Sequence, residues 1–150
     1  MTEPDFPELP APLQLPALIQ RLAEAQGWEN KNRALVQLAR EMPALPDALR
    51  DDAHRVIGCE ARVWLYAKWQ DESDRPRLSI WVDSDSRIVK GLLALVWAAY
   101  AGRNAEDVRQ FDFAALLQEL GLSRFLSSSR VNGLTAIVNA LRQAANVIPT

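Results

Sequence analysis

The chain has 150 residues, of which 49% are hydrophobic and 24% are charged, as in one ordinary soluble globular domain. A formal net charge of −2 offers no basic surplus for nucleic acid, and the longest apolar run, residues 91–102, is too short for a membrane span of about 20 residues. The single cysteine excludes an internal disulfide, and the N-terminus does not resemble a secretory signal. We therefore expect a cytoplasmic protein without nucleic-acid or membrane partners.

The N-terminal third predicts a lead-in followed by two helices. Residues 1–15 carry four of the nine prolines, which predicts an extended, poorly ordered segment before a single domain over 16–150. Amphipathic patterns predict helices over 16–27 and 28–43. Their boundaries are marked by residues typical of helix ends: Pro16, Gly27 and Pro43. A turn-rich connector follows over 43–54.

The middle third changes to the two-residue period of strands. Residues 61–69 are rich in aromatic and β-branched side chains, and residues 77–83 alternate between apolar and polar. The polar cluster at 71–76 predicts a turn between them, so the two runs should form an antiparallel hairpin. Residues 54–57 are predicted to add a short third strand, with a bend at Gly58 and Cys59.

The last third returns to helical spacing. Helices are predicted over 86–102, 105–110, 113–120 and 127–146. Residues suited to capping helices stand at their starts: Asp85 or Ser86, Asn104, Asp112 and Ser127. The order of elements predicts an α+β fold, in which a small antiparallel sheet of about three strands is flanked by N-terminal and C-terminal helices.

Cys59, the only cysteine, is the candidate reactive residue. It follows Gly58 in "RVIGCEARVWL" (55–65), at a break between two strand-like runs, where a thiol is more accessible than inside a strand. Glu60 opposes ionisation of the thiol. The nearby basic residues favour the thiolate: His54, Arg55 and Arg62. A lone cysteine is nevertheless more often an inert small hydrophobe, so the pattern alone leaves both interpretations open.

Other kinds of site have little support in the sequence. One histidine and one cysteine supply at most half of a zinc site, and phosphate-binding glycine motifs are absent from the sequence. A Cys–His pair is conceivable because His54 and Cys59 lie five residues apart. The acids of "DSD" (83–85) more simply end a strand and cap a helix. We expect neither a metal nor a cofactor bound by this chain.

Four segments carry a family resemblance. "HRVIGCEARVWL" (54–65) resembles the sulfur-acceptor loop of the SufE/CsdE family and leans toward its CsdE branch. "WENKNRALVQLAREMPALP" (28–46) resembles the family's second helix with its proline turn, and "DSDSRIVKGLLALV" (83–96) resembles its "SDARIVRGLLA" segment. The C-terminal "ELGL…LSSSRVNGL" matches its last signature, and the four segments stand in the family's order.

The resemblance implies a SufE/NifU-like fold and a sulfur-transfer protein. Such proteins accept sulfur from the persulfide of a pyridoxal-phosphate cysteine desulfurase of the SufS or CsdA type. They hold it as a cysteine persulfide, stimulate the desulfurase, and pass the sulfur to an iron–sulfur scaffold or another sulfur-using pathway. By position, the acceptor is Cys59. The residues expected to support the loop or contact the partner are Gly58, His54, Arg55, Glu60, Arg62, Asp85 and Arg87.

Arg87 resembles an arginine that the family uses near the acceptor loop. Its predicted place in the first turn of a helix is electrostatically unfavourable, because the helix dipole disfavours positive charge there. This misfit favours a partner contact over a purely solvated side chain.

Two other classes of function stay open. The chain could be a non-catalytic interaction domain in which the cysteine is incidental. It could also be a thiol-redox sensor that uses Cys59 through a sulfenic acid, although the sequence contains no second cysteine to resolve that species.

Overall fold

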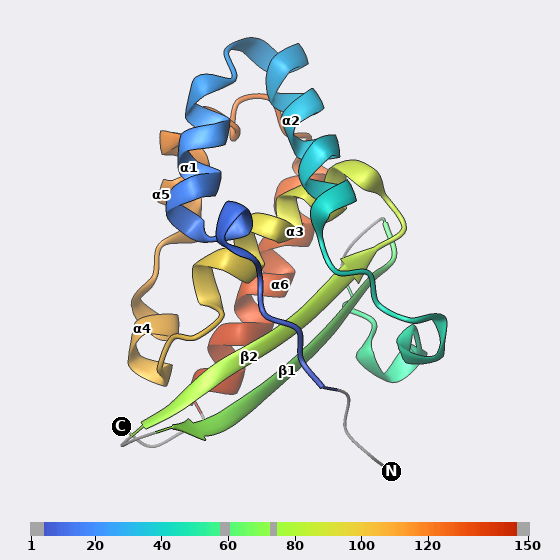
Figure 1. Cartoon of the computed structure of the whole chain (residues 1–150), viewed down its shortest axis with the longest axis vertical. Helices are drawn as coiled ribbons and strands as arrows, with labels where there is room; N and C mark the ends of the chain where they lie inside the picture. Colours follow the sequence, from blue (N-terminus) through green and yellow to red (C-terminus); the bar gives the residue numbers. More distant parts are fainter. Residues whose placement is uncertain (1–4, 58–60, 73–74, 147–150) are drawn as a thin grey trace.

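The computed structural model describes residues 5–57, 61–72 and 75–146. Figure 1 shows a β-hairpin lying across helices α3 and α6, with α1 and α2 at one end of the molecule. The strands are β1 (Val63–Glu72) and β2 (Arg75–Ser84). The helices are α1 (Leu15–Glu24), α2 (Gly27–Glu41), α3 (Arg87–Tyr100), α4 (Ala105–Gln110), α5 (Phe113–Glu119) and α6 (Ser128–Asn146).

The predicted hairpin is confirmed. β1 and β2 pair antiparallel, with Val63 opposite Ser84 and Glu72 opposite Arg75. The α+β class is therefore correct, but the described residues form a sheet of two strands and not three.

The third strand predicted over 54–57 is wrong. Asp52–His54 form a short 3-10 turn, and the Asp51 carboxylate accepts the backbone N–H of His54 at 3.0 Å. This cap curls the chain at His54, the first residue of the predicted strand. Only an isolated bridge between Arg55 and Trp64 follows it.

Helix boundaries follow local chemistry. Side-chain oxygens of Ser86, Asn104 and Asp112 each accept a backbone N–H in the first turn of α3, α4 and α5, as the sequence predicts. Gly102 follows α3 with a φ of 81°, a conformation that favours glycine. The helices that frame the hairpin therefore begin and end at residues with a local physical reason.

Helix α3 forms the centre of the core. Most of its residues are buried, and it packs against both α2 and the inner face of β2, where Leu78, Ile80 and Val82 point. Alternation along β2 thus places one row of side chains in the core. Within the part of the chain described, no helix combines the length and apolar character that crossing a bilayer requires.

The proline-rich segment contributes to this core, contrary to the expectation of a poorly ordered lead-in. Leu9 and Leu13 are buried, and residues Ala11–Leu13 form a 3-10 turn that leads directly into α1. The Gln14 side-chain amide also donates to the carbonyl of Leu9, at 2.5 Å. Leu9 and Leu13 therefore anchor the described part of this segment in the hydrophobic core.

Replacement of Gly91 should test the contact between α2 and α3. A Cβ at Gly91 would lie 2.2 Å from the carbonyl oxygen of Leu35, so Gly91→Ala must push the helices apart. We expect a loss of about 1–3 kcal/mol or more in the free energy of unfolding measured with urea. Gly102→Ala is the matched control, because it has open space and only a backbone penalty of about 1–2 kcal/mol. A Gly91→Ala protein as stable as wild type would contradict this packing.

Candidate functional site

Residues 57–61 form the segment that the family resemblance predicts to be the acceptor loop, and the structure describes its two ends. Gly58, Cys59 and Glu60 lie outside the described residues, whereas Ile57 and Ala61 lie inside them. Cys59 is two residues from each of these ends along the sequence. The Ile57 side chain is 83% exposed, which is unusual for a large apolar residue and places an apolar contact point beside the loop.

Both ends of the loop are attached to the hairpin. On one side, the Val56 N–H donates to the Val63 carbonyl at 2.9 Å. On the other, the Arg62 carbonyl accepts from the Ser84 hydroxyl at 2.7 Å and from the Asp85 N–H at 3.3 Å. These hydrogen bonds hold the two described ends of the loop at one end of the sheet.

An ion pair between Arg62 and Asp85 lies at the same end of the loop. The Arg62 Nε donates to Asp85 Oδ2 at 2.8 Å, and the Arg62 backbone N–H donates to Oδ1 at 3.2 Å. The Arg62 hydrogen bond lowers the pKa of the Asp85 carboxyl. The structure thus brings together these two predicted site residues. Because Asp85 offsets the charge of Arg62, this guanidinium is less able to favour a nearby thiolate than the sequence suggests.

His54 is held away from the strand position predicted for it. Its Nδ1 lies 2.7 Å from Asp51 Oδ1, and its ring stacks on Tyr66 with the ring centroids 3.7 Å apart. The hydrogen bond with His54 lowers the pKa of the Asp51 carboxyl. His54 is therefore hydrogen-bonded locally, and its predicted role in supporting the loop or contacting a partner stays a prediction.

Exposed cations without an acidic partner lie near the loop. Arg55 and Arg87 are both exposed, and within residues 5–57, 61–72 and 75–146 neither has a hydrogen-bonded or ion-paired carboxylate. Arg87 is the first residue of α3, where the dipole disfavours its charge. The structure is consistent with a partner contact at these residues, which stays a prediction.

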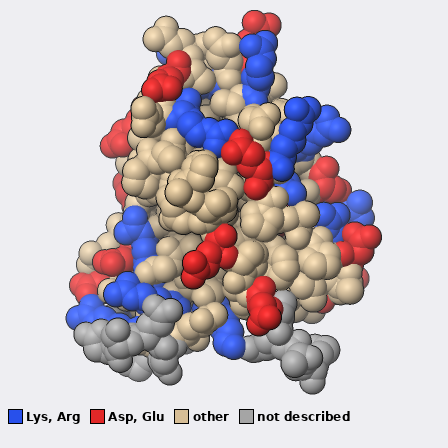
Figure 2. Space-filling view, in the orientation of Figure 1, with Lys and Arg blue, Asp and Glu red and all other residues tan. Residues whose placement is uncertain are grey.

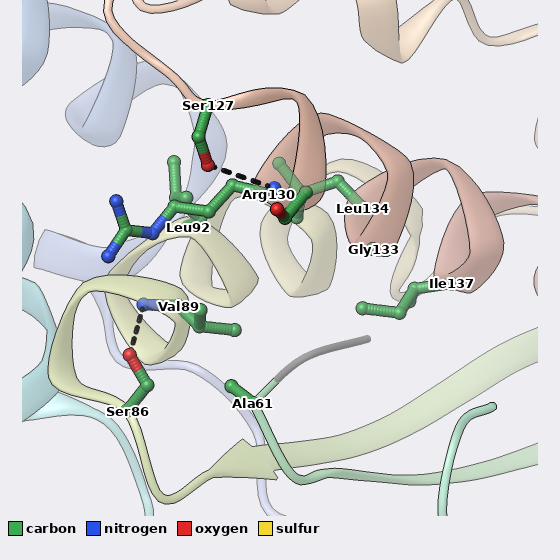
Figure 3. Close-up of a pocket in the computed structure, with 10 residues that line it drawn as sticks. Ala61, Ser86, Val89, Leu92, Ser127, Arg130, Gly133, Leu134 and Ile137 are labelled. Carbon is green, nitrogen blue, oxygen red and sulfur yellow. Dashed lines mark hydrogen bonds between the residues drawn. The ribbon is translucent and has the colours of Figure 1, made fainter. Parts of the chain in front are cut away.

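A cavity of about 200 Å³ opens beside the loop, between the first turns of α3 and α6. Figure 3 shows Ala61, Val89 and Ile137 directed into the same space. The residues that line it are Ala61, Ser86, Val89, Leu92, Ser127, Ser129, Arg130, Gly133, Leu134 and Ile137. Ala61, which follows Cys59 by two residues in the sequence, belongs to the wall of this cavity.

The cavity reveals Arg130, which the sequence patterns did not single out. Arg130 lies in the first turn of α6, where its backbone N–H donates to the Ser127 hydroxyl at 3.3 Å. Its side chain is exposed at the edge of the cavity. Arg130 belongs to "LSSSRVNGL", a segment that already showed the family resemblance. This segment is about 70 residues from the loop in sequence, so only the fold brings Arg130 near the ends of the loop.

Asp83 is a second residue whose importance the sequence did not indicate. It is 0% exposed, and its Oδ2 accepts from the Leu45 N–H at 2.8 Å and from Arg50 Nη2 at 3.0 Å. Its Oδ1 accepts from the Ser84 N–H at 2.8 Å and lies 3.2 Å from Lys90 Nζ. Asp83 therefore connects the segment after α2, the end of β2 and the first turns of α3.

A metal centre has no support in the described residues. Within them, no group of three or more His, Cys, Asp or Glu side chains is placed to hold an ion. The expectation that this chain binds no cofactor stays a prediction.

Removal of the Asp83 charge should destabilise the fold far more than removal of the Asp85 charge. Asp83→Asn leaves Arg50 and Lys90 partly buried without their carboxylate, which should cost about 3 kcal/mol or more in unfolding free energy. Asp85→Asn breaks an exposed pair and should cost under about 1 kcal/mol. Urea unfolding of both proteins measures the difference, and equal losses would refute the role given to Asp83.

The comparisons with known proteins agree with the geometry. Residues 16–145 match the sequence profile of the SufE family, described as an Fe-S metabolism associated domain. The chain is 37% identical to the sulfur acceptor protein CsdE of Escherichia coli, over 99% of this chain and all of that protein. It is 35% identical to an uncharacterized SufE-like protein of Rhizobium etli, over 80% of this chain and 81% of the relative.

A solved structure shows the same fold. The solution structure of a hypothetical protein from Thermus thermophilus superposes with a TM-score of 0.62 at 23% identity, covering 89% of this chain and 96% of that one. Given the profile match over most of its length and these two relatives, the chain belongs to the SufE family.

Proposed function

We propose that this protein is a sulfur acceptor that takes sulfur from the persulfide of a cysteine desulfurase onto Cys59. The observation that carries the proposal is the position of the only cysteine, between loop ends that are fastened to the hairpin beside an open cavity. Family membership and the similarity to a protein named as a sulfur acceptor support the same function.

The proposed transfer is a thiol–persulfide exchange. The Cys59 thiolate attacks the outer sulfur of the desulfurase persulfide, the bond between the two sulfurs of that persulfide breaks, and the desulfurase cysteine leaves as a thiolate. A new sulfur–sulfur bond forms on Cys59, so the exchange needs no external oxidant or reductant. The desulfurase supplies pyridoxal phosphate for the release of sulfur from free cysteine, and this chain supplies the nucleophile.

The described surroundings suit such a nucleophile. The exposed cations Arg55 and Arg130 near the ends of the loop and at the cavity favour the ionised form of a nearby thiol. The exposed Ile57 offers an apolar contact to a docking partner. A reducing cytoplasm would keep the thiol ready to react.

The next recipient of the sulfur must carry a nucleophile that can attack the persulfide on Cys59. A persulfide carrier hands its outer sulfur to another nucleophile, so an iron–sulfur scaffold or another sulfur-using enzyme would receive it. The association of the family with Fe-S metabolism favours the scaffold.

The variant Cys59→Ser should bind the desulfurase without stimulating it. Serine has nearly the same size, so fold stability should change by under about 0.5 kcal/mol, but its hydroxyl barely ionises at neutral pH. The measurement is the rate of alanine formation from cysteine, with and without each acceptor. The variant should also compete with the wild type, because most of an interface lies outside one atom.

Two results would favour the alternatives. Stimulation by Cys59→Ser equal to wild type would remove Cys59 as the acceptor and support an interaction domain. Peroxide reactivity of Cys59 far above that of free cysteine, without sulfur transfer from any desulfurase, would support a redox sensor.

Replacement of Arg87 tests the predicted partner contact. Arg87→Ala should weaken stimulation of the desulfurase while leaving thermal stability unchanged, since Arg87 gains nothing from the dipole of α3. Arg33→Ala, an exposed arginine within α2, is the control. Wild-type stimulation by a stably folded Arg87→Ala protein would show that Arg87 does not contact the partner.

A further inference from the structure

A basic groove adjoins the base of the acceptor loop. It has a volume of about 390 Å³ and lies between the last turn of α2, the connector after it and the first turn of α3. The basic residues that line it are Arg40, Arg50, Arg87 and Lys90. Figure 2 shows a cluster of basic side chains over α2, whereas acidic side chains are spread across that face of the molecule.

The charges of this groove are not balanced by its own acids. Asp83 contacts both Arg50 and Lys90, and Asp85 is paired with Arg62. The guanidinium groups of Arg40 and Arg87 are exposed, and neither has a carboxylate partner among the described residues. Two positive charges therefore stand uncompensated at the edges of the groove, in a chain whose net charge is −2.

The groove lies within reach of any protein that delivers sulfur to Cys59. Asp85 lines it and is hydrogen-bonded to Arg62, which is three residues from Cys59 along the sequence. A specific interface covers about 800 Å² on each partner, a patch about 30 Å across. A desulfurase docked over the loop is therefore large enough to contact the groove as well.

Carboxylates are the chemistry that fits best. Guanidinium groups pair with carboxylates in fixed, two-pronged geometry, and isolated arginines at an interface suit isolated acidic side chains. A phosphate backbone would instead require a continuous basic surface. The fully exposed Asp47, whose carboxylate lies 4.0 Å from Arg50, interrupts any such surface here.

We propose that this groove binds acidic side chains of the cysteine desulfurase, with Arg40 as a contact in addition to Arg87. The inference rests on the proposed function and specifies the surface and partner chemistry that it uses. Arg40 lies on α2, outside the acceptor loop and the cavity, and takes no part in the transfer of sulfur. Its contribution is to docking, through the rate and salt dependence of association.

The test compares Arg40→Glu with Arg33→Glu, two identical charge reversals at exposed positions of one helix. The probe is a pyridoxal-phosphate cysteine desulfurase that the wild-type chain stimulates. Arg40→Glu should raise the acceptor concentration for half-maximal stimulation by about tenfold at low salt, with the saturating rate unchanged. The difference should shrink as salt is added, and Arg33→Glu should match the wild type.

Each outcome separates this proposal from the function on which it rests. Arg40→Gln, which removes the charge without reversing it, should give a smaller effect in the same direction. If both charge reversals behave alike, the groove proposal fails and sulfur transfer to Cys59 stands. If the wild type accepts no sulfur from any desulfurase, both fail. Tight binding of an RNA duplex that Arg40→Glu abolishes would assign the groove to phosphate and overturn the proposal.

Discussion

The buried carboxylate of Asp83 is the interaction on which the geometry of the site depends. It receives two backbone N–H groups and two cations, which compensate for the cost of removing the charge from water. These partners come from separate parts of the chain: the connector after α2, the end of β2, and α3. Two residues later, Asp85 holds Arg62 and thereby the base of the acceptor loop. The described end of the loop at Arg62 is therefore attached two residues away in sequence from a fully buried carboxylate.

This arrangement explains how a chain with so few reactive groups can perform chemistry. Thiol–persulfide exchange requires an accessible thiolate and a docked donor, and needs no metal or acid–base pair in the acceptor. The fold contributes a fastened loop base, a cavity between two helix starts, and exposed cations around them. On the proposed function, the protein presents one sulfur atom and guides a partner to it.

Local patterns predicted the local features of this structure. The hairpin and the caps of α3, α4 and α5 depend on residues close in sequence, so periodicity and capping rules found them. The prediction of a third strand was wrong because the carboxylate of Asp51 caps a 3-10 turn, which takes the place of the extended conformation that a strand requires. The order of the lead-in was missed because Leu9 and Leu13 join a core built from distant helices.

The site divides in the same way. Cys59 and its flanking residues could be selected from one stretch of sequence and a family resemblance. The burial of Asp83, the cavity at Arg130 and the groove at Arg40 depend on which segments the fold brings together, and no local pattern encodes that. From sequence alone, Asp83 at the end of a strand is interpreted as a helix cap. Its contacts with Arg50 and Lys90 become evident only in the folded structure.

Sulfur transfer to Cys59 can be measured as the intact mass of the chain after one turnover with a cysteine desulfurase and cysteine, without reductant. If Cys59 is the acceptor, the wild-type chain gains the mass of one sulfur atom, a thiol reductant reverses the gain, and peptide mapping assigns the sulfur to Cys59. A wild-type chain that stimulates the desulfurase yet never gains sulfur, or that gains it at another residue, would show that Cys59 is not the acceptor.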